Sequence, residues 1–318
     1  MTFTVIDPGI MTTVQDTGRW GYQQYGISPS GCMDTSSAAL ANLIAGNDPD
    51  CALLECMMSG PEINFNDKTS FVITGADFAP LFNGIRIPAY TLIHAKAGDV
   101  LRFKGLRNGM FAYIAFSGGI DTVPQLGSRS THLHSRLGGF DGRQLKRGDV
   151  VPVGEPENPS INSKDIKLNI RPYWSSDITL RVIPDRQEGA FTKDGLRTFY
   201  AATFLLTSSC DRMGYRLDGP YIEHTGSADI ITDGIVFGSV QVPVSGDPII
   251  MMADHQTTGG YTRIANVISC DLPKLAQSAP GTRVKFTSVR VDAAQRELVG
   301  TIRQFNEIRS LVNRIVKG

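Results

Sequence analysis

The sequence lacks the motifs that most often identify an enzyme or a nucleotide-binding protein. It contains no GxxxxGK[ST] phosphate loop, no GxGxxG fingerprint, no HExxH zinc motif and no GxSxG nucleophile elbow. It also has no run of 18 apolar residues, so we expect no transmembrane helix and no membrane partner. The function therefore has to be inferred from less common patterns.

Neither an excess of positive charge nor an ordered set of cysteines is present. The 31 basic and 31 acidic residues cancel, and binding nucleic acid requires a basic excess or stripe, so no nucleic-acid partner is expected. The five cysteines form no CxxC, which indicates reduced thiols of a cytoplasmic protein. The first residues lack the basic and apolar regions of a secretory signal, which favours the same location. Only His132 and His134 could share a strand face, and no further ligand joins them, so no metal site is predicted.

Glycine and proline, in contrast, are plentiful. The chain has 33 glycines and 17 prolines among 318 residues, and these residues punctuate many short apolar runs. Such a pattern predicts a mainly β fold with a few helices, divided into two units at this length. A weak internal repeat, Ser59-Gly60-Pro61 against Asp218-Gly219-Pro220, fits two related β units, although chance explains it as well.

The predicted organisation follows from where the composition changes along the chain. Residues 1–155 form a first β unit with an inserted helix near 34–46, which Gly46 can end in the left-handed conformation. The polar, proline-bearing segment 156–176 is a linker, and residues 177–290 form the second unit. Residues 291–318 are an amphipathic helix. Its apolar stripe, which includes Phe305, should pack on the body of the protein.

One stretch, residues 248–265, concentrates polar chemistry behind a buried strand. The apolar run 249–253 predicts the strand, and Asp254 to Tyr261 then offer a carboxylate, an imidazole, an amide, hydroxyls and a phenol. Gly259 and Gly260 allow a sharp turn or a close approach of the backbone to a ligand, and we expect at least one of them to have a positive φ or to lie against a ligand. A hairpin with ordinary surface side chains is an equally good interpretation.

Two further segments have the residue types that bind anions. Arg19, between glycines, could present its guanidinium to a carboxylate or phosphate. The Gly-Ser-Arg-Ser-Thr run at 127–131 could form a nest of backbone N–H and hydroxyl donors. Solvated surface loops remain the alternative for both.

Several longer motifs resemble one family, allophanate hydrolase subunit 2, which includes the C subunit of 5-oxoprolinase, KipA-type regulators and the carboxyltransferase segment of urea carboxylase. The resemblance runs from about Thr12 to Phe286 through TTVQDTGRWGY, LGSRST, DRMGYRL and VQVPVSGDPIIMMADHQTTGGY. It implies two cyclophilin-like β-barrel units packed together. At 185–187 the family usually has Gly-Pro-Gln, whereas this chain has Asp185-Arg186-Gln187.

The resemblance also implies site residues. The catalytic candidates are Arg212, Asp254, Gln256 and Tyr261. The candidates for substrate binding are Arg19, Asp34, Ser128, Ser130, Thr131, Gln187, Gln241, Thr257, Thr258, Gly259 and Gly260. Purely structural roles remain open for some of them: Arg212 in a buried ion pair, Asp34 as a helix cap, and Gln187 and Gln241 as partners of backbone groups.

The activity that the resemblance implies is the opening of 5-oxoproline to glutamate with ATP hydrolysis. The chain would act with the B subunit of 5-oxoprolinase and with its LamB/YcsF-type A subunit, and ATP would be used by the complex. The first alternative is a carboxyltransferase component of a urea-carboxylase-like system, for which biotin would be the cofactor. The second is a KipA-type regulator that acts by binding a partner.

Overall fold

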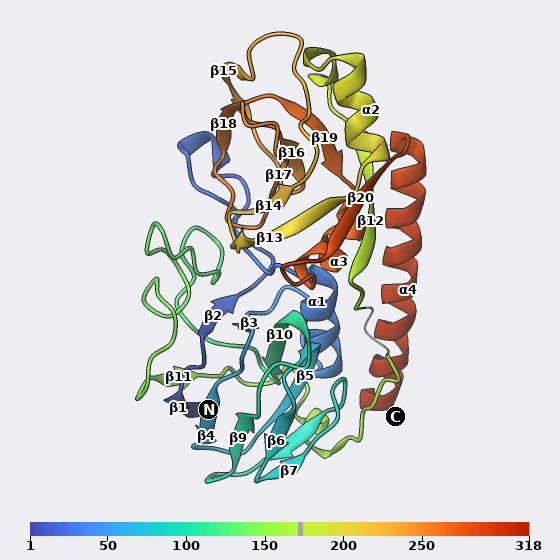
Figure 1. Cartoon of the computed structure of the whole chain (residues 1–318). Coiled ribbons are helices and arrows are strands. Elements are labelled where there is room, and N and C mark those ends of the chain that lie inside the picture. The colour runs from blue at the N-terminus through green and yellow to red at the C-terminus, as the bar shows by residue number, and fades with distance from the viewer. Residues whose placement is uncertain (171–173, 318) are drawn as a thin grey trace. The chain divides into compact units, whose positions relative to one another are not determined.

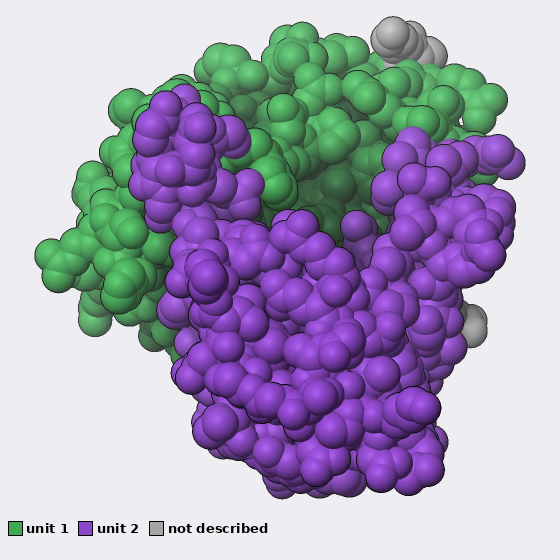
Figure 2. All heavy atoms as spheres, turned by 90° about the horizontal axis from the view of Figure 1, so that it is seen from above, with its two compact units in different colours: residues 1–20, 30–173, 304–318 green, residues 21–29, 174–303 purple. Residues whose placement is uncertain are grey.

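The protein is described by a computed structural model, which covers residues 1–170 and 174–317. The chain divides into two compact units (Figure 2). Unit 1 comprises residues 1–20, 30–173 and 304–318, and unit 2 comprises residues 21–29 and 174–303. The predicted linker, residues 156–176, includes residues 171–173, which lie outside the described part. Its earlier portion packs within unit 1, because the side chains of Ile161 and Ile166 are both buried.

Unit 1 contains two antiparallel sheets. The six-stranded sheet has the order β11-β1-β4-β9-β6-β7, and the five-stranded sheet has the order β2-β3-β10-β5-β8. Their strands are β1 (Thr2–Asp7), β2 (Met11–Gln15), β3 (Leu53–Met57), β4 (Glu62–Phe65), β5 (Thr69–Asp77), β6 (Pro80–Phe82), β7 (Ile85–Arg86), β8 (Ile93–Ala95), β9 (Val100–Phe103), β10 (Asn108–Phe116) and β11 (Val150–Pro152). A short 3₁₀ helix, η2 (Pro159–Ser163), follows them.

The two sheets of unit 1 enclose one apolar core. Phe3 of the first sheet stacks on Phe116 of the second with ring centroids 4.8 Å apart, and Phe65 stacks on Phe71 at 5.2 Å. Period-two alternation places these rings on the inner faces. The predicted mainly β class is confirmed, although the strands of unit 1 form two sheets and the closed barrel is found in unit 2.

Helix α1 (Thr35–Ile44) covers the five-stranded sheet through contacts with β5 and β10 (Figure 1). Asp34 is its N-cap, and its carboxylate accepts hydrogen bonds from the backbone N–H of Ser37 at 2.9 Å and from the Ser37 hydroxyl at 2.6 Å. Gly46 follows the helix with a φ of 76°. The inserted helix and both of its end signals are thus as predicted.

Unit 2 is built on a closed seven-stranded barrel with the order β12-β19-β16-β17-β14-β13-β20. A separate two-stranded sheet, β15-β18, is called the ribbon below. The strands are β12 (Asp177–Pro184), β13 (Phe204–Cys210), β14 (Gly214–Asp218), β15 (Asp229–Gly234), β16 (Ser239–Gln241), β17 (Ile249–Met251), β18 (Thr258–Tyr261), β19 (Arg263–Val267) and β20 (Arg283–Ser288). The helical elements are η1 (Gln23–Tyr25), η3 (Glu188–Ala190), α2 (Lys193–Ala201), η4 (Ser269–Asp271) and α3 (Leu272–Ala276).

The C-terminal helix α4 (Val291–Lys317) is present as predicted (Figure 1), but its apolar stripe is not uniformly buried. Residues 291–303 belong to unit 2 and the later residues to unit 1. Val312 is 2% exposed, whereas Leu298 is 42% exposed and Phe305 is only half-buried. The expectation of a core-like stripe is therefore wrong for most of the helix, because short polar contacts such as Arg181–Glu297 and Arg309–Asp48 attach it instead.

Candidate functional site

The stretch 248–265 forms a buried strand followed by the second strand of the ribbon. Residues 249–251 are β17, as predicted, and Thr258–Tyr261 are β18. Neither Gly259 nor Gly260 has a positive φ, and both continue an extended strand, so a positive φ is excluded while a close approach to a ligand stays a prediction. A Cβ on Gly259 would lie 2.4 Å from Cδ1 of Ile235 and 2.6 Å from Nε2 of Gln241, so the ends of these two side chains would have to move. Gly260 has no comparable neighbour among the described residues.

Arg212 and Asp254 lie side by side despite their separation in sequence. The guanidinium donates from Nε to Oδ2 of Asp254 at 2.8 Å and from Nη2 to Oδ1 at 2.9 Å. Both side chains are buried. This bidentate geometry is the strongest form of a charge-assisted hydrogen bond. These two catalytic candidates therefore lie together, in the form of the structural ion pair that was the alternative interpretation of Arg212.

The side chains that follow this pair are open to solvent. Tyr261 is 42% exposed, Gln256 and Thr258 are exposed, and Thr257 is half-buried. Within the described part of the chain, none of these four side chains makes a hydrogen bond. Their hydroxyl and amide groups are therefore available to a ligand, which the buried pair is not.

Gln187 and Gln241 hold the backbone, as their alternative interpretation proposed. The Gln187 carboxamide accepts from the backbone N–H of Arg263 at 2.9 Å and donates to Oδ2 of Asp233 at 3.1 Å. Gln241 is buried, and its Nε2 lies 3.4 Å from the carbonyl oxygen of Tyr261. Each of the two side chains therefore donates a hydrogen bond to a residue of the ribbon.

Four charged residues of this region were not among the predicted site residues. Arg263 donates from Nη2 to Asp233 at 2.8 Å and from Nε to Asp185 at 3.2 Å, although its side chain is only 6% exposed. The pKa of Asp233 is held far below its ordinary value, first by the Arg186 guanidinium and then by that of Arg263. A single Arg two positions after Tyr261 gives no sequence signal that distinguishes it from a solvated one. The one feature of the sequence that pointed to this cluster is Asp185-Arg186, where the family usually has Gly-Pro.

The anion nest predicted at Ser128–Thr131 exists, but its anion is a side chain of the protein. Oδ1 of Asp16 accepts from the hydroxyls of Ser128 at 2.7 Å and Ser130 at 2.5 Å, and Oδ2 accepts from the Arg129 backbone N–H at 2.5 Å. The Thr131 hydroxyl donates to the carbonyl of Val14. The donors of Ser128, Ser130 and Thr131 thus already have partners within the protein, and a substrate-binding role for these residues stays a prediction.

Arg19 and Asp34 are likewise turned inward. Arg19 is completely buried and donates to the carbonyl oxygens of Gln125 at 3.0 Å and Ser130 at 2.7 Å. The Arg19 side chain is therefore not part of a solvated turn, and the donors named here bind backbone carbonyls of the protein. Asp34 caps α1. The predicted anion-binding groups thus already have partners within the protein: the nest encloses Asp16, and the Arg212 guanidinium binds Asp254.

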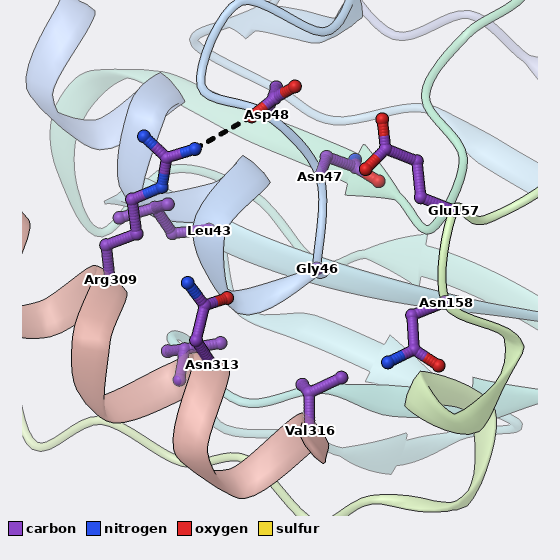
Figure 3. Close-up of a pocket in the computed structure, with 10 residues that line it drawn as sticks. Leu43, Gly46, Asn47, Asp48, Glu157, Asn158, Arg309, Asn313 and Val316 are labelled. Carbon is purple, nitrogen blue, oxygen red and sulfur yellow. Dashed lines mark hydrogen bonds and ion pairs between the residues drawn. The ribbon is translucent and has the colours of Figure 1, made fainter.

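A small pocket of about 250 Å³ lies in unit 1, away from all predicted site residues (Figure 3). It is bounded by the end of α1, by Glu157 and Asn158, and by the last turns of α4, where Arg309 pairs with Asp48 at 3.0 Å. The charged residues that line it are exposed, and its apolar lining consists of Leu43, Val312 and Val316. Within the described residues, no group of three His, Cys, Asp or Glu could hold a metal ion, and no helix could cross a membrane.

Comparison with known proteins identifies the family. The model of the carboxyltransferase domain, subdomains A and B, matches residues 25–288. The chain is 36% identical over 310 residues to the C subunit of 5-oxoprolinase from Escherichia coli (strain K12), and the match covers 96% of each chain. The Haemophilus influenzae protein of the same name is 35% identical and is covered to 95% of its length.

More distant relatives are parts of larger proteins. The urea amidolyase of Saccharomyces cerevisiae is 32% identical over 305 residues, and the chain spans 17% of its length. The crystal structure of the K. lactis urea amidolyase matches 96% of this chain and 20% of that chain, with a TM-score of 0.88 and 27% identity. The family match and the two full-length relatives establish that the chain belongs to the family of the carboxyltransferase domain, subdomains A and B.

Proposed function

We propose that the chain is the C subunit of a 5-oxoprolinase complex, which opens 5-oxoproline to glutamate with hydrolysis of ATP. One observation carries this proposal: 36% identity over 96% of both chains to a protein named as the C subunit of 5-oxoprolinase. Such a relationship extends over the complete relative, whereas the urea amidolyase match covers a small part of that protein.

The geometry of unit 2 supports a site for a small polar substrate on the ribbon. Gln256, Thr257, Thr258 and Tyr261 offer an amide and three hydroxyls with no hydrogen-bond partner among the described residues, and Gln241 and Arg263 hold the ribbon beside them. A lactam has one carbonyl acceptor and one N–H donor, which such groups can bind. The Tyr261 hydroxyl could donate to the oxygen on which negative charge develops.

Asp254 acts by position in this proposal. Both of its oxygens accept from Arg212, and its backbone N–H donates to the Arg212 carbonyl at 2.7 Å, so the pair fixes the start of the segment that leads to the ribbon. In this proposal Asp254 could also take or orient a proton, directly or through Gln256. The chain's own residues bind and orient the substrate, and we place ATP use in the assembled complex in the cytoplasm.

The proposed partners are the B subunit of 5-oxoprolinase and its LamB/YcsF-type A subunit. The test is to assay ATP-dependent release of glutamate from 5-oxoproline by the pure chain, and then with both partners added. We expect turnover only from the assembled complex. Full turnover by the chain alone would refute the need for partners.

A variant pair tests the ribbon as the substrate site. Tyr261→Phe should reduce kcat of the complex about tenfold or more, since one oxyanion donor is worth that much in comparable sites. Tyr221→Phe is the matched control, because Tyr221 is also exposed in unit 2 but lies outside the ribbon. Equal activity of both variants would remove Tyr261 from the site.

The alternative function is carboxyl transfer in a biotin-dependent, urea-carboxylase-like system. The observation in its favour is the TM-score of 0.88 to the K. lactis urea amidolyase over 96% of this chain. A complex that is inactive on 5-oxoproline, but accepts a carboxyl group from carboxybiotin, would establish this alternative. Partner binding without either activity would favour a KipA-type regulator.

A further inference from the structure

The ribbon of unit 2 is attached to the barrel in an unusual way. β15 and β18 pair with each other and with no barrel strand among the described residues. On its outer side, Ile231 is 95% exposed. A two-stranded ribbon alone is marginally stable in water. Its position must therefore depend on contacts that its side chains make with the rest of unit 2.

One carboxylate of the ribbon receives most of those contacts. Oδ2 of Asp233 accepts from Nη2 of Arg186 at 2.7 Å, from Nη2 of Arg263 at 2.8 Å and from Nε2 of Gln187 at 3.1 Å. These three donors come from two separate segments, residues 186–187 after β12 and the start of β19. In addition, Nη1 of Arg263 donates to the carbonyl of Gly234 at 2.5 Å.

The donors differ in how firmly they are held. Arg263 is almost fully buried and is itself fixed by Oδ2 of Asp185 at 3.2 Å, which also accepts from Nδ2 of Asn266 at 2.8 Å. Arg186, by contrast, is 76% exposed, and an ion pair in such a position contributes little. Arg263 is thus the fixed half of the contact and Asp233 the half that belongs to the ribbon.

We propose that Asp233 is a positioning residue, a latch that holds the ribbon against the barrel and so sets the orientation of the Thr258 and Tyr261 side chains toward a small substrate. This inference rests on the proposed function for its link to substrate. The latch acts through the register pair Asp233–Gly259, because Gly259 is next to Thr258 and two residues before Tyr261. In this proposal Gln187 is a positioning residue as well, because its carboxamide nitrogen donates to Asp233 and its carboxamide oxygen accepts from the Arg263 backbone N–H.

The local sequence makes this latch a property of the present chain. Asp185 and Arg186 supply a carboxylate that fixes Arg263 and a guanidinium that binds Asp233. A Gly-Pro pair in these two positions would offer neither group. We therefore infer that the ribbon of this chain is held by more charged contacts than Gln187 and Arg263 alone would provide.

The test compares Asp233→Asn with Asp229→Asn in the assembled complex. Asp229 is the matched control: it is on the same strand of the ribbon, it loses the same charge, and its carboxylate accepts no hydrogen bond among the described residues. We expect amide hydrogen exchange of residues 229–234 and 258–261 to become about tenfold faster in Asp233→Asn, which corresponds to about 1.4 kcal/mol of local opening. The control should exchange like the wild type.

The kinetic expectation is a separation of KM from kcat. Because a loosened ribbon is an extra conformational state that binds substrate poorly, KM should rise about tenfold in Asp233→Asn while kcat changes by less than about twofold. Arg186→Ala removes the exposed partner and should give a smaller change in the same direction. A rise in KM of the Arg186→Ala variant would support the proposal even if Asp233→Asn does not fold, and an unchanged KM would then argue against it.

The outcomes separate this inference from the proposed function. Unchanged hydrogen exchange in Asp233→Asn, or an equal change in Asp229→Asn, would overturn the latch. Faster exchange with an unchanged KM would overturn its link to substrate. A complex without activity on 5-oxoproline would argue against the proposed function, yet hydrogen exchange would still decide whether Asp233 holds the ribbon.

Discussion

Unit 1 and unit 2 each surround one carboxylate with several donors, but they do so with different groups. Asp16 in unit 1 accepts from two serine hydroxyls and from the backbone N–H groups of Gly18 and Arg129, and those serines are buried. Asp233 in unit 2 accepts from one backbone N–H but mainly from side chains, two guanidinium groups and one carboxamide, and its own side chain is 31% exposed.

The difference between the donors indicates a different role for each carboxylate. Short, buried donors have few alternative rotamers and no water to replace a lost partner, so the Asp16 nest fixes the fold. Long side chains at a surface can exchange their partner for water, so the Asp233 latch can open without unfolding the unit. Both sites satisfy a negative charge, yet only the second is suited to adjust a binding surface.

The largest expected effect comes from removing Asp16, the half-buried carboxylate that fills the nest of unit 1. Asp16→Ala leaves the Ser128 and Ser130 hydroxyls and the Arg129 backbone N–H without their acceptor, and should lower the free energy of unfolding by about 3 kcal/mol. Chemical denaturation measures it. Asp121→Asn, which removes an exposed ion pair with Arg129, is the control and should cost less than about 1 kcal/mol. Similar costs for the two variants would contradict a structural nest.

The buried ion pair of unit 2 provides the second test, because its side chains are buried like the serine donors of the Asp16 nest and charged like the groups of the Asp233 latch. Asp254→Asn leaves the Arg212 guanidinium buried with a neutral partner, and breaking such a pair costs about 3 kcal/mol or somewhat less when the amide retains one hydrogen bond. A melting temperature within the error of the wild type would show that burial does not govern these sites.

Apolar contacts of α4 should show the same contrast between buried and exposed groups. Val312→Ala should cost about 2 kcal/mol, since the side chain is 2% exposed, whereas Leu298→Ala should cost less than about 1 kcal/mol. Alanine favours the helix more strongly over valine than over leucine, so the stability loss measured by thermal denaturation for Val312→Ala is a lower limit of its packing contribution. A larger loss for Leu298→Ala would mean that the first half of α4 is the better-packed half.

Salt should separate the two carboxylates by a smaller amount. The stability difference between the wild type and Asp233→Asn should shrink as the salt concentration rises from about 0.05 M to about 0.5 M, because screening acts on partly exposed charges. The difference for Asp16→Ala should stay constant, since its donors are neutral. Parallel salt dependence would place both carboxylates in the same class.

The smallest expected effect is a dependence of stability on pH in unit 2. Burial lowers the pKa of His255 and of His224 below the ordinary value of 6.5. Their contribution to stability is complete above pH 6.5 and is lost as the pH falls through their lowered pKa values, since the unfolded chain then binds more protons. The melting temperature should fall between about pH 6.5 and about pH 5, and His255→Gln should weaken this dependence.

The sequence by itself determined those features that depend on neighbouring residues. The cap of α1 at Asp34 and its glycine end at Gly46 depend only on local turn chemistry, and the buried strand 249–251 on a short apolar run. The family could be identified because its motifs are long and continuous. The mainly β class followed from the frequent glycines and prolines between apolar runs.

Only the tertiary structure decided which polar groups have partners within the protein and which are left for a ligand. Arg19, Ser128 and Ser130 have the residue types of an anion site, and nothing in the sequence shows that Asp16, more than 110 residues before the serines, fills it. Asp233 and Arg263 meet in the same way across the chain. A hydrogen-bond donor has the same sequence signature whether its acceptor is a substrate or a distant carboxylate, because that choice depends on how strands far apart in sequence pair and pack.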